Sequence, residues 1–234
     1  MEFLSRTALL VGDGYFDRIM AKRVAVFGVG GVGGYVAEML CRSGVCDFLI
    51  CDNDVVSVSN INRQIIATAH TVGRSKTEVL AERLSAINPE VKIQIVNEFL
   101  MPDNVDKYIT ADLDFVCDAV DTVTAKLAII RRCNELSVPV ISSMGAGNRV
   151  DPLMVRTGDV FETENDPLAR VMRRELRKMG VEKLACVYSG ELPVKPVVSE
   201  TELKNGRSAP GSTAFVPAVF GIAMAAYVVN KLTF

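Results

Sequence analysis

The sequence has a single histidine, His70, and none of its six cysteines forms a Cys-x-x-Cys pair. Structural zinc sites take four cysteine or histidine ligands, so these absences argue against zinc. Most of the cysteines lie in apolar runs, which is typical of reduced, buried thiols in a cytoplasmic protein. No acidic residue close to His70 would orient its ring, so we expect a packing or surface role rather than a catalytic one.

An excess of charge of either sign is also missing. There are 26 lysines and arginines against 28 acidic residues, and the net charge at pH 7 is −2. Binding to nucleic acid would therefore need a local basic patch. Apolar residues make up 49% of the 234 residues, which is enough for the core of one large domain.

Long hydrophobic segments are absent as well. The apolar run Ala214–Val229 contains Pro217 and is shorter than the roughly 20 residues that cross a bilayer. Near the amino terminus, Glu2, Arg6 and Asp13 interrupt the apolar residues, so we expect no signal peptide. We interpret the run as a buried packing helix and expect no stable insertion into a membrane.

Short apolar runs alternate with segments of helical spacing over the first 150 residues. The predicted strands are Arg23–Phe27, Phe48–Cys51, Val91–Val96, Leu113–Ala119 and Val138–Ser142, and the predicted helices are Tyr35–Cys41, Ser75–Ile87 and Ala125–Leu136. This alternation predicts an α/β fold with a Rossmann-like, doubly wound and mostly parallel sheet.

A glycine-rich turn, Gly28-x-Gly30-x-x-Gly33, joins the first predicted strand to its helix, and Asp52 ends the second strand. Glycines let the backbone approach a phosphate, and the start of a helix offers free N–H groups. An acid at the end of the second strand suits a ribose. These features predict nucleotide binding; the alternative is a turn used only for tight packing.

Charged residues after the turn favour ATP over NAD. Arg63 and Lys76 follow the ribose acid, and two cations near the phosphates suit a triphosphate whose pyrophosphate must leave. Asp121 follows the fourth strand, where a carboxylate can hold Mg²⁺ against phosphate oxygens. The alternative for these cations is ordinary surface charge. An NAD oxidoreductase is disfavoured because no histidine or tyrosine arrangement for hydride transfer is evident.

The sequence pattern changes after residue 150. It then contains an amphipathic helix at Asp166–Met179, a strand at Leu184–Ser189 and a polar loop at Gly190–Gly211. We divide the chain into a nucleotide-binding core, residues 1–150, and a C-terminal extension or lobe, residues 151–234, within one continuous domain. A loop of this length is usually functional or mobile.

Four parts of the sequence occur together here: Gly28–Gly33, Asp52–Gln64, Lys76 and Asp118–Asp121. This set resembles the adenylation core of the ubiquitin-activating-enzyme-like superfamily. Three further strings, Ser142–Asn148, Asp166–Arg177 and Pro210–Ser212, resemble its tRNA threonylcarbamoyladenosine dehydratase branch. With them the resemblance spans nearly the whole chain.

The resemblance implies roles for individual residues. Asp52 would hold the ribose, Asp121 would bind Mg²⁺, and Arg6 would reach the phosphates of a neighbouring subunit in a symmetric homodimer. One departure is Gly34, where a serine is expected after the glycines. The residues assigned to the nucleotide are Gly28, Gly30, Gly31, Gly33, Asp52, Asp54, Asn60, Arg63, Gln64 and Lys76, and those assigned to catalysis are Arg6, Arg63, Lys76 and Asp121.

The activity that the resemblance implies is ATP-dependent dehydration of N6-threonylcarbamoyladenosine in tRNA, in which the threonyl carboxylate is adenylated before the ring closes. The second candidate is an adenylyltransferase for the C-terminal glycine of a ubiquitin-like sulfur carrier, and the missing Cys-x-x-Cys pairs count against it. A third is a nucleotide-binding scaffold for sulfur-relay proteins. Cys186 lies in an apolar strand and is interpreted as structural. Binding of a cysteine desulfurase or other sulfur-relay proteins is left open.

One face of the predicted helix Asp166–Met179 is basic. Its cationic residues are Arg170, Arg173, Arg174, Arg177 and Lys178, and Lys204 and Arg207 in the loop could add to them. Such a face is either an ordinary solvated surface or a patch that binds tRNA phosphates. Both interpretations stay open at this point.

Overall fold

The computed structural model describes residues 2–12, 14–195, 203–204, 207–208 and 210–234. Seven strands form one sheet in the order β3-β2-β1-β4-β5-β7-β6. Their bounds are β1 (Arg23–Phe27), β2 (Asp47–Cys51), β3 (Lys92–Val96), β4 (Phe115–Asp118), β5 (Val140–Ser143), β6 (Val155–Asp159) and β7 (Ala185–Ser189). Neighbouring strands are parallel except β6 and β7. The predicted doubly wound, mostly parallel sheet is confirmed, and β6 is an additional strand.

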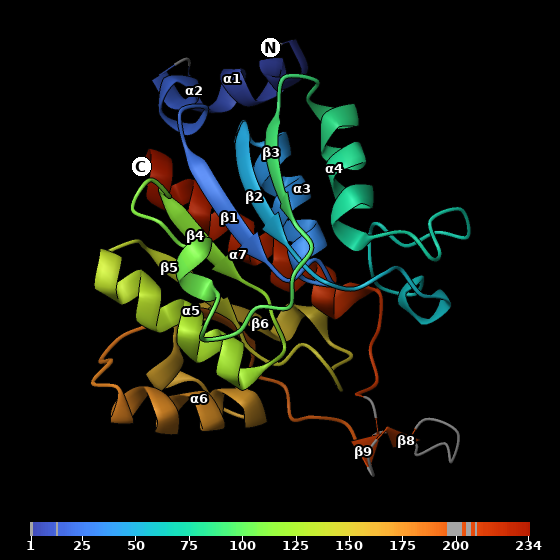
Figure 1. Cartoon of the computed structure of the whole chain (residues 1–234), viewed down its shortest axis with the longest axis vertical. Coiled ribbons are helices and arrows are strands. Elements are labelled where there is room, and N and C mark those ends of the chain that lie inside the picture. Colours follow the sequence, from blue (N-terminus) through green and yellow to red (C-terminus); the bar gives the residue numbers. More distant parts are fainter. Residues whose placement is uncertain (1, 13, 196–202, 205–206, 209) are drawn as a thin grey trace.

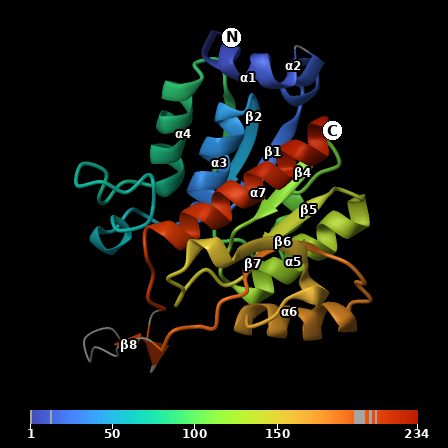
Figure 2. The same cartoon turned by 180° about the vertical axis from the view of Figure 1, so that it is seen from behind.

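Helices cover both faces of the sheet and give three layers (Figures 1 and 2). One face carries α3 (Gly33–Arg42), α4 (Lys76–Ile87) and α7 (Phe215–Thr233), and the other carries α5 (Val123–Leu136) and α6 (Pro167–Lys178). Because both faces are covered, the central strands β1, β2 and β4 are almost wholly buried, which explains their continuous apolar sequences.

Residues 151–234 add β6 and β7 to the same sheet and α7 to its face. Among the described helices, α7 is long and apolar enough to cross a membrane. It runs diagonally over the sheet beside α3 in Figure 2, and Phe220, Met224 and Val228 are buried there. The expected packing helix is therefore confirmed.

Several short elements were not expected from the sequence. α1 (Ser5–Val11) and α2 (Gly14–Ile19) lie at the amino-terminal end of the strands in Figure 1. The predicted loop Gly190–Gly211 contains a small antiparallel pair, β8 (Leu203–Lys204) and β9 (Arg207–Ser208). Most of the rest of that loop, and the side chains of Lys204 and Arg207, lie outside the described residues. The 3-10 helices are Glu2–Leu4, Val58–Asn60, Val105–Lys107, Pro152–Met154 and Val160–Glu162.

The order of the strands fixes where a ligand can bind. From β1 the chain continues to β2 and β3 on one side of the sheet centre and returns to β4 on the other. Ligands of open α/β sheets bind at such a switch point, beyond the carboxyl ends of the strands. Gly28 and Ala119 follow β1 and β4 there, next to each other.

Candidate functional site

A cleft of about 570 Å³ opens at the carboxyl ends of β1, β2 and β4. Its lining brings together residues that are far apart in the sequence and that were expected to meet a nucleotide. Those residues are Gly28, Gly30, Gly31, Asp52, Asp54, Asn60, Arg63, Gln64, Lys76 and Asp121. The exceptions among the expected nucleotide and catalytic residues are Gly33 and Arg6.

Gly33 is needed for packing rather than for the lining of the cleft. A Cβ atom at Gly33 would lie 1.8 Å from the carbonyl oxygen of Gly28, and one at Gly28 would lie 2.6 Å from that of Ala119. Gly28 also has a φ of 87°, which side chains disfavour. The turn is thus closed tightly onto β4. Gly34 faces Ile65 rather than the cleft, so a serine hydroxyl is not missed in the lining.

Asp52 joins the glycine turn to the end of β2. Its Oδ2 accepts a hydrogen bond from the backbone N–H of Val29 (2.6 Å), and its Oδ1 accepts one from Asp54 (2.8 Å). A carboxylate oxygen can accept a second hydrogen bond, so Asp52 can also receive a ribose hydroxyl. This carboxylate therefore both orders the turn and faces the cleft.

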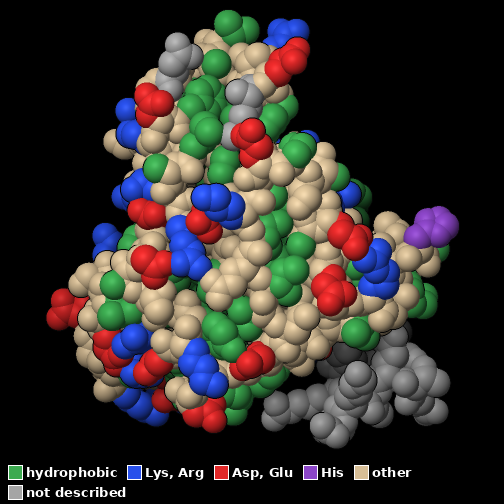
Figure 3. Space-filling model, turned by 45° about the horizontal axis from the view of Figure 1, so that its top comes forward, with side chains coloured by type: hydrophobic (Ala, Val, Ile, Leu, Met, Phe, Trp, Pro, Cys, Tyr) green, Lys and Arg blue, Asp and Glu red, His purple; other side chains and the backbone are tan. Residues whose placement is uncertain are grey.

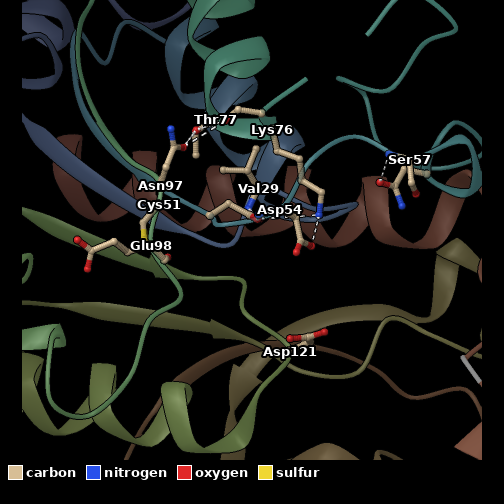
Figure 4. Close-up of polar contacts among 12 residues, drawn as sticks. Val29, Cys51, Asp54, Ser57, Lys76, Thr77, Asn97, Glu98 and Asp121 are labelled. Carbon is tan, nitrogen blue, oxygen red and sulfur yellow. Dashed lines mark hydrogen bonds and ion pairs between the residues drawn. The ribbon is translucent and has the colours of Figure 1, made fainter. Parts of the chain in front are cut away.

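Lys76 is the most buried cation of the cleft lining. Its Nζ lies 2.6 Å from Asp54 Oδ2 and 4.0 Å from Asp52 Oδ1, and Figure 4 shows Lys76 and Asp54 on one wall of the cleft. Lys76 begins α4, which holds its backbone at the carboxyl edge of the sheet. The ammonium is therefore fixed beside two carboxylates, at the place where negative charge is expected from a ligand.

The segment between β2 and α4 supplies Asn60, Arg63 and Gln64. Arg63 Nη1 donates to the carbonyl oxygen of Ser59 (2.7 Å), while its aliphatic stem lies over Gly31. Asn60 Oδ1 accepts a hydrogen bond from the backbone N–H of Ser57, so the carbonyl group of this side chain is already bonded within the protein. The buried Gln64 Oε1 has no hydrogen-bond partner within the described part of the chain.

Asp121 lies on the opposite wall, facing Lys76 and Asp54 across the cleft in Figure 4. It is exposed, and within the part of the chain that the structure describes its side chain accepts a single long hydrogen bond, from Thr122 Oγ1 (3.2 Å). The residues with described positions include no cluster of three or more metal-ligating side chains. A cation at Asp121 would therefore complete its ligand shell with phosphate oxygens and water.

A buried ion pair that the sequence did not predict supports this wall. Lys126 Nζ, on α5, donates to Asp118 Oδ2 (3.1 Å) and to the carbonyl oxygen of Ser143 (2.7 Å). Ser142 Oγ donates to the same carboxylate oxygen (2.6 Å). These contacts tie together the ends of β4 and β5 and the start of the loop that carries Asp121. A lysine on the otherwise apolar side of a helix was the signal in the sequence.

Other residues of the cleft were also missed. Glu98, Phe99 and Leu100 follow β3 and line the cleft on the side of Cys51 and Asp52. Their position after a strand end was the available signal. The opposite part of the lining includes Ala146, Gly147, Pro210, Ser212 and Pro217.

Comparison with known protein families shows where this chain belongs. A model of the ThiF family matches residues 4–233. The chain belongs to the ThiF family. The tRNA threonylcarbamoyladenosine dehydratase of Bacillus subtilis (strain 168) is 37% identical over 237 residues, which cover 97% of this chain and 93% of the relative.

Solved structures extend the likeness to three dimensions. Complexes of the E. coli tRNA N6-threonylcarbamoyladenosine dehydratase with AMP and with ATP align with TM-scores of 0.91 and 0.90, each at 34% identity. Both alignments cover 99% of this chain, and they cover 94% and 93% of the two solved chains. The fold of this ThiF-family chain is thus that of an enzyme solved with ATP.

In this ThiF-family chain, Arg6 lies away from its own cleft. It is exposed on α1, at the opposite end of the strands (Figures 1 and 2). The role that the resemblance implies for Arg6, at the phosphates of a neighbouring subunit, stays a prediction.

The basic helix α6 of the ThiF-family chain is only partly free. Arg173 is half-buried and donates to the carbonyl oxygens of Thr163 (3.0 Å) and Val160 (3.4 Å), so it fastens α6 instead of facing solvent. Arg177 lies over the ring of Phe161, at 5.3 Å from its centroid. Arg174 and Lys178 are exposed and flank Glu175. Arg170 is also exposed. The expected tRNA contact of Arg173 stays a prediction, and its Nη1 is already bonded within the protein.

Neither Cys186 nor His70 is among the residues that line the cleft. All six cysteines are free and five are buried. Burial raises the pKa of Cys186 to about 12, which disfavours the thiolate needed for a thioester or persulfide. His70 is exposed, and Figure 3, with histidine in purple, shows it at the surface. The structural interpretation of Cys186 is confirmed.

Proposed function

We propose that this protein catalyses the ATP-dependent dehydration of N6-threonylcarbamoyladenosine in tRNA through adenylation of its carboxylate. The observation that carries the proposal is the cleft, in which the glycine turn, Lys76 and Asp121 surround one space at the switch point of the sheet. The near full-length similarity to dehydratases supports the same activity.

The lining suggests how ATP binds. The base would lie beside Phe99 and Leu100, the ribose would reach Asp52, and the phosphates would follow the glycine turn towards Arg63 and Lys76. Mg²⁺ is commonly bound by one or two carboxylates together with substrate phosphates, and the exposed Asp121 fits that pattern. The ion would neutralise charge on the phosphates.

The reaction needs activation of a poor electrophile. A carboxylate oxygen of the threonyl group attacks the α-phosphorus of ATP, the bond to the bridging oxygen breaks, and pyrophosphate leaves. A nitrogen or oxygen of the carbamoyl unit then attacks the acyl carbon, and AMP leaves with the oxygen that the substrate loses. Lys76 and Arg63 stabilise the charge that develops on the phosphates. Ring closure is intramolecular, so it requires no nucleophile from the protein.

The proposal includes a symmetric homodimer. Leu9 and Leu10 on α1 are 82% and 85% exposed, and hydrophobic side chains reach the surface at this end of the molecule in Figure 3. Exposed apolar side chains grouped in this way favour a protein interface. In the proposed dimer the edge of the partner's cleft packs on this face, so that Arg6 of each subunit would reach the phosphates bound by the other. The exposed cationic residues of α6 would bind tRNA phosphates.

One assay separates this function from its alternative. The purified protein is incubated with ATP, Mg²⁺ and tRNA that carries threonylcarbamoyladenosine, and the nucleosides are analysed by mass spectrometry. The proposal expects loss of one water per modified nucleoside, with formation of AMP and pyrophosphate. No dehydration, together with adenylation of the C-terminal glycine of a ubiquitin-like sulfur carrier, would establish the alternative. The variant Asp121→Asn is expected to be inactive but folded.

A further inference from the structure

Asn148 and Gly211 form a reciprocal pair of hydrogen bonds between distant parts of the chain. The backbone N–H of Asn148 donates to the carbonyl oxygen of Gly211 (2.7 Å), and the N–H of Gly211 donates to Asn148 Oδ1 (2.7 Å). Asn148 has a φ of 58°, in the left-handed region that asparagine and aspartate tolerate better than most residues. The residue type therefore suits both its backbone and its bond.

Both partners of this pair lie next to the lining of the cleft. Ala146 and Gly147 precede Asn148, and Pro210 and Ser212 flank Gly211; these four residues line the cleft. A Cβ atom at Gly147 would lie 2.8 Å from Pro210 Cβ, so the two segments are in direct contact. Asn62 Nδ2 also donates to the carbonyl oxygen of Ser212 (3.0 Å). The side chains of Asn148 and Asn62 thus hold the segment Pro210–Ser212 at the lining of the cleft.

This part of the lining, which we call the 147/210 wall, consists of Ala146, Gly147, Pro210 and Ser212. None of these four residues has a charged side chain, and Asn62 lies between Ser212 and the nearest cation, Arg63. A substrate carboxylate must reach the α-phosphate from a side that the nucleotide leaves open. A wall of small, uncharged residues offers space for the neutral parts of an acyl group.

We propose that Asn148 is a positioning residue that fixes Pro210–Ser212 as the wall against which the threonylcarbamoyl arm of the tRNA lies during adenylation. This inference rests on the proposed function and deepens it. Asn148 acts through Gly211 and does not touch ATP. Its loss would therefore affect the acyl substrate more than the nucleotide.

Steady-state kinetics of three enzymes test this inference: the wild type, Asn148→Ala and Asn148→Asp. Aspartate keeps the acceptor for Gly211 and tolerates the left-handed backbone, and alanine provides neither. We expect Asn148→Ala to raise the KM for modified tRNA about tenfold, the effect of losing roughly one hydrogen bond, while the KM for ATP changes less than about twofold. Asn148→Asp is expected to restore the wild-type KM for tRNA.

Three results would overturn the proposed role of the wall. They are an equal rise in both KM values, an aspartate variant as impaired as the alanine variant, and an alanine variant with the KM values of the wild type. If Asn148→Ala folds poorly, Asn148→Gly replaces it, because glycine keeps the backbone and removes only the acceptor. A wild-type enzyme that leaves the tRNA unchanged would contradict the proposed function itself, whereas an active wild type with an unaffected Asn148→Ala contradicts the wall alone.

Discussion

Lys76 Nζ lies 2.6 Å from Asp54 Oδ2, in an ion pair whose two members differ strongly in exposure. Lys76 is 6% exposed, whereas the side chain of Asp54 is 60% exposed. A pair with one solvated member is worth less than a fully buried pair, because water screens the attraction between its charges. The carboxylate can therefore give way to a triphosphate, and the lysine is already in place to receive it.

Replacement of Lys76 should affect catalysis far more than replacement of its partner. We expect Lys76→Met to lower kcat about 10²–10³-fold, because a fixed cation no longer stabilises the charge that leaves with pyrophosphate. Asp54→Asn should stay within about tenfold of the wild type, since the weak ion pair is not part of the transition state. Pyrophosphate release with modified tRNA measures both.

A matched control is Lys92→Met, which removes an exposed lysine at the far end of β3 and should leave the rate unchanged. Equal losses in the Lys76 and Lys92 variants would show that Lys76 acts only through the overall charge of the protein.

The Lys126–Asp118 pair should matter for stability. Both side chains are fully buried, and removing one member leaves the other charged without compensation. We expect Lys126→Met to lower the free energy of unfolding by about 3–5 kcal/mol in urea titrations. The double variant Lys126→Met with Asp118→Asn should recover part of this loss. If the free energy of unfolding of Lys126→Met equals that of the wild type within experimental error, the pair does not stabilise the end of β4.

The pattern of the sequence was sufficient for the central sheet and for one wall of the cleft. The apolar strands β1, β2 and β4 are covered on both faces, so their burial is visible in their composition. β6 was missed because it is an edge strand with half-exposed residues such as Arg156 and Gly158, which leave no hydrophobic pattern. α1 and α2 are short, and periodicity cannot be recognised over six or seven residues.

Contacts between distant segments could not be predicted in the same way. Pro210–Ser212 meets Ala146 and Gly147 only because α7 returns the chain to the sheet, and no local signal marks that contact. The cationic residues of α6 were visible as a group. Their individual roles were not, since Arg173 is distinguished only by the carbonyl oxygens of Val160 and Thr163 that the fold places beside it.

Acid should destabilise the protein partly through Glu38. Burial alone would raise the pKa of Glu38, but hydrogen bonds and charge from Arg83 and Arg42 outweigh it and lower the pKa. A lowered pKa in the folded state gives stability that is present above the ordinary glutamate pKa of about 4.3 and is lost as the pH falls through the folded value.

We therefore expect Glu38→Gln to flatten the loss of unfolding free energy as the pH falls from about 5 to about 3. Glu90→Gln, which changes an exposed glutamate, serves as the control and should leave the slope unchanged. A slope in Glu38→Gln as steep as in the wild type would place the acid sensitivity elsewhere.

The exposed cations of α6 should set the salt dependence of tRNA binding. Each phosphate contact that is lost should lower the slope of log K against log salt by roughly 1, so Arg170→Gln and Arg174→Gln should each flatten it. Arg173→Gln should instead lower thermal stability, because it breaks bonds to the turn before α6. Unchanged slopes in the first two variants would favour an ordinary solvated face.

The fate of one oxygen atom tests the central claim, adenylation of the substrate carboxylate, most directly. Modified tRNA whose threonyl carboxylate carries a heavy-oxygen label is turned over with ATP and Mg²⁺, and the products are analysed by mass spectrometry. Attack of the carboxylate on the α-phosphorus predicts one labelled oxygen in AMP and none in pyrophosphate. Label in pyrophosphate, or dehydration that yields unlabelled AMP, would contradict this account.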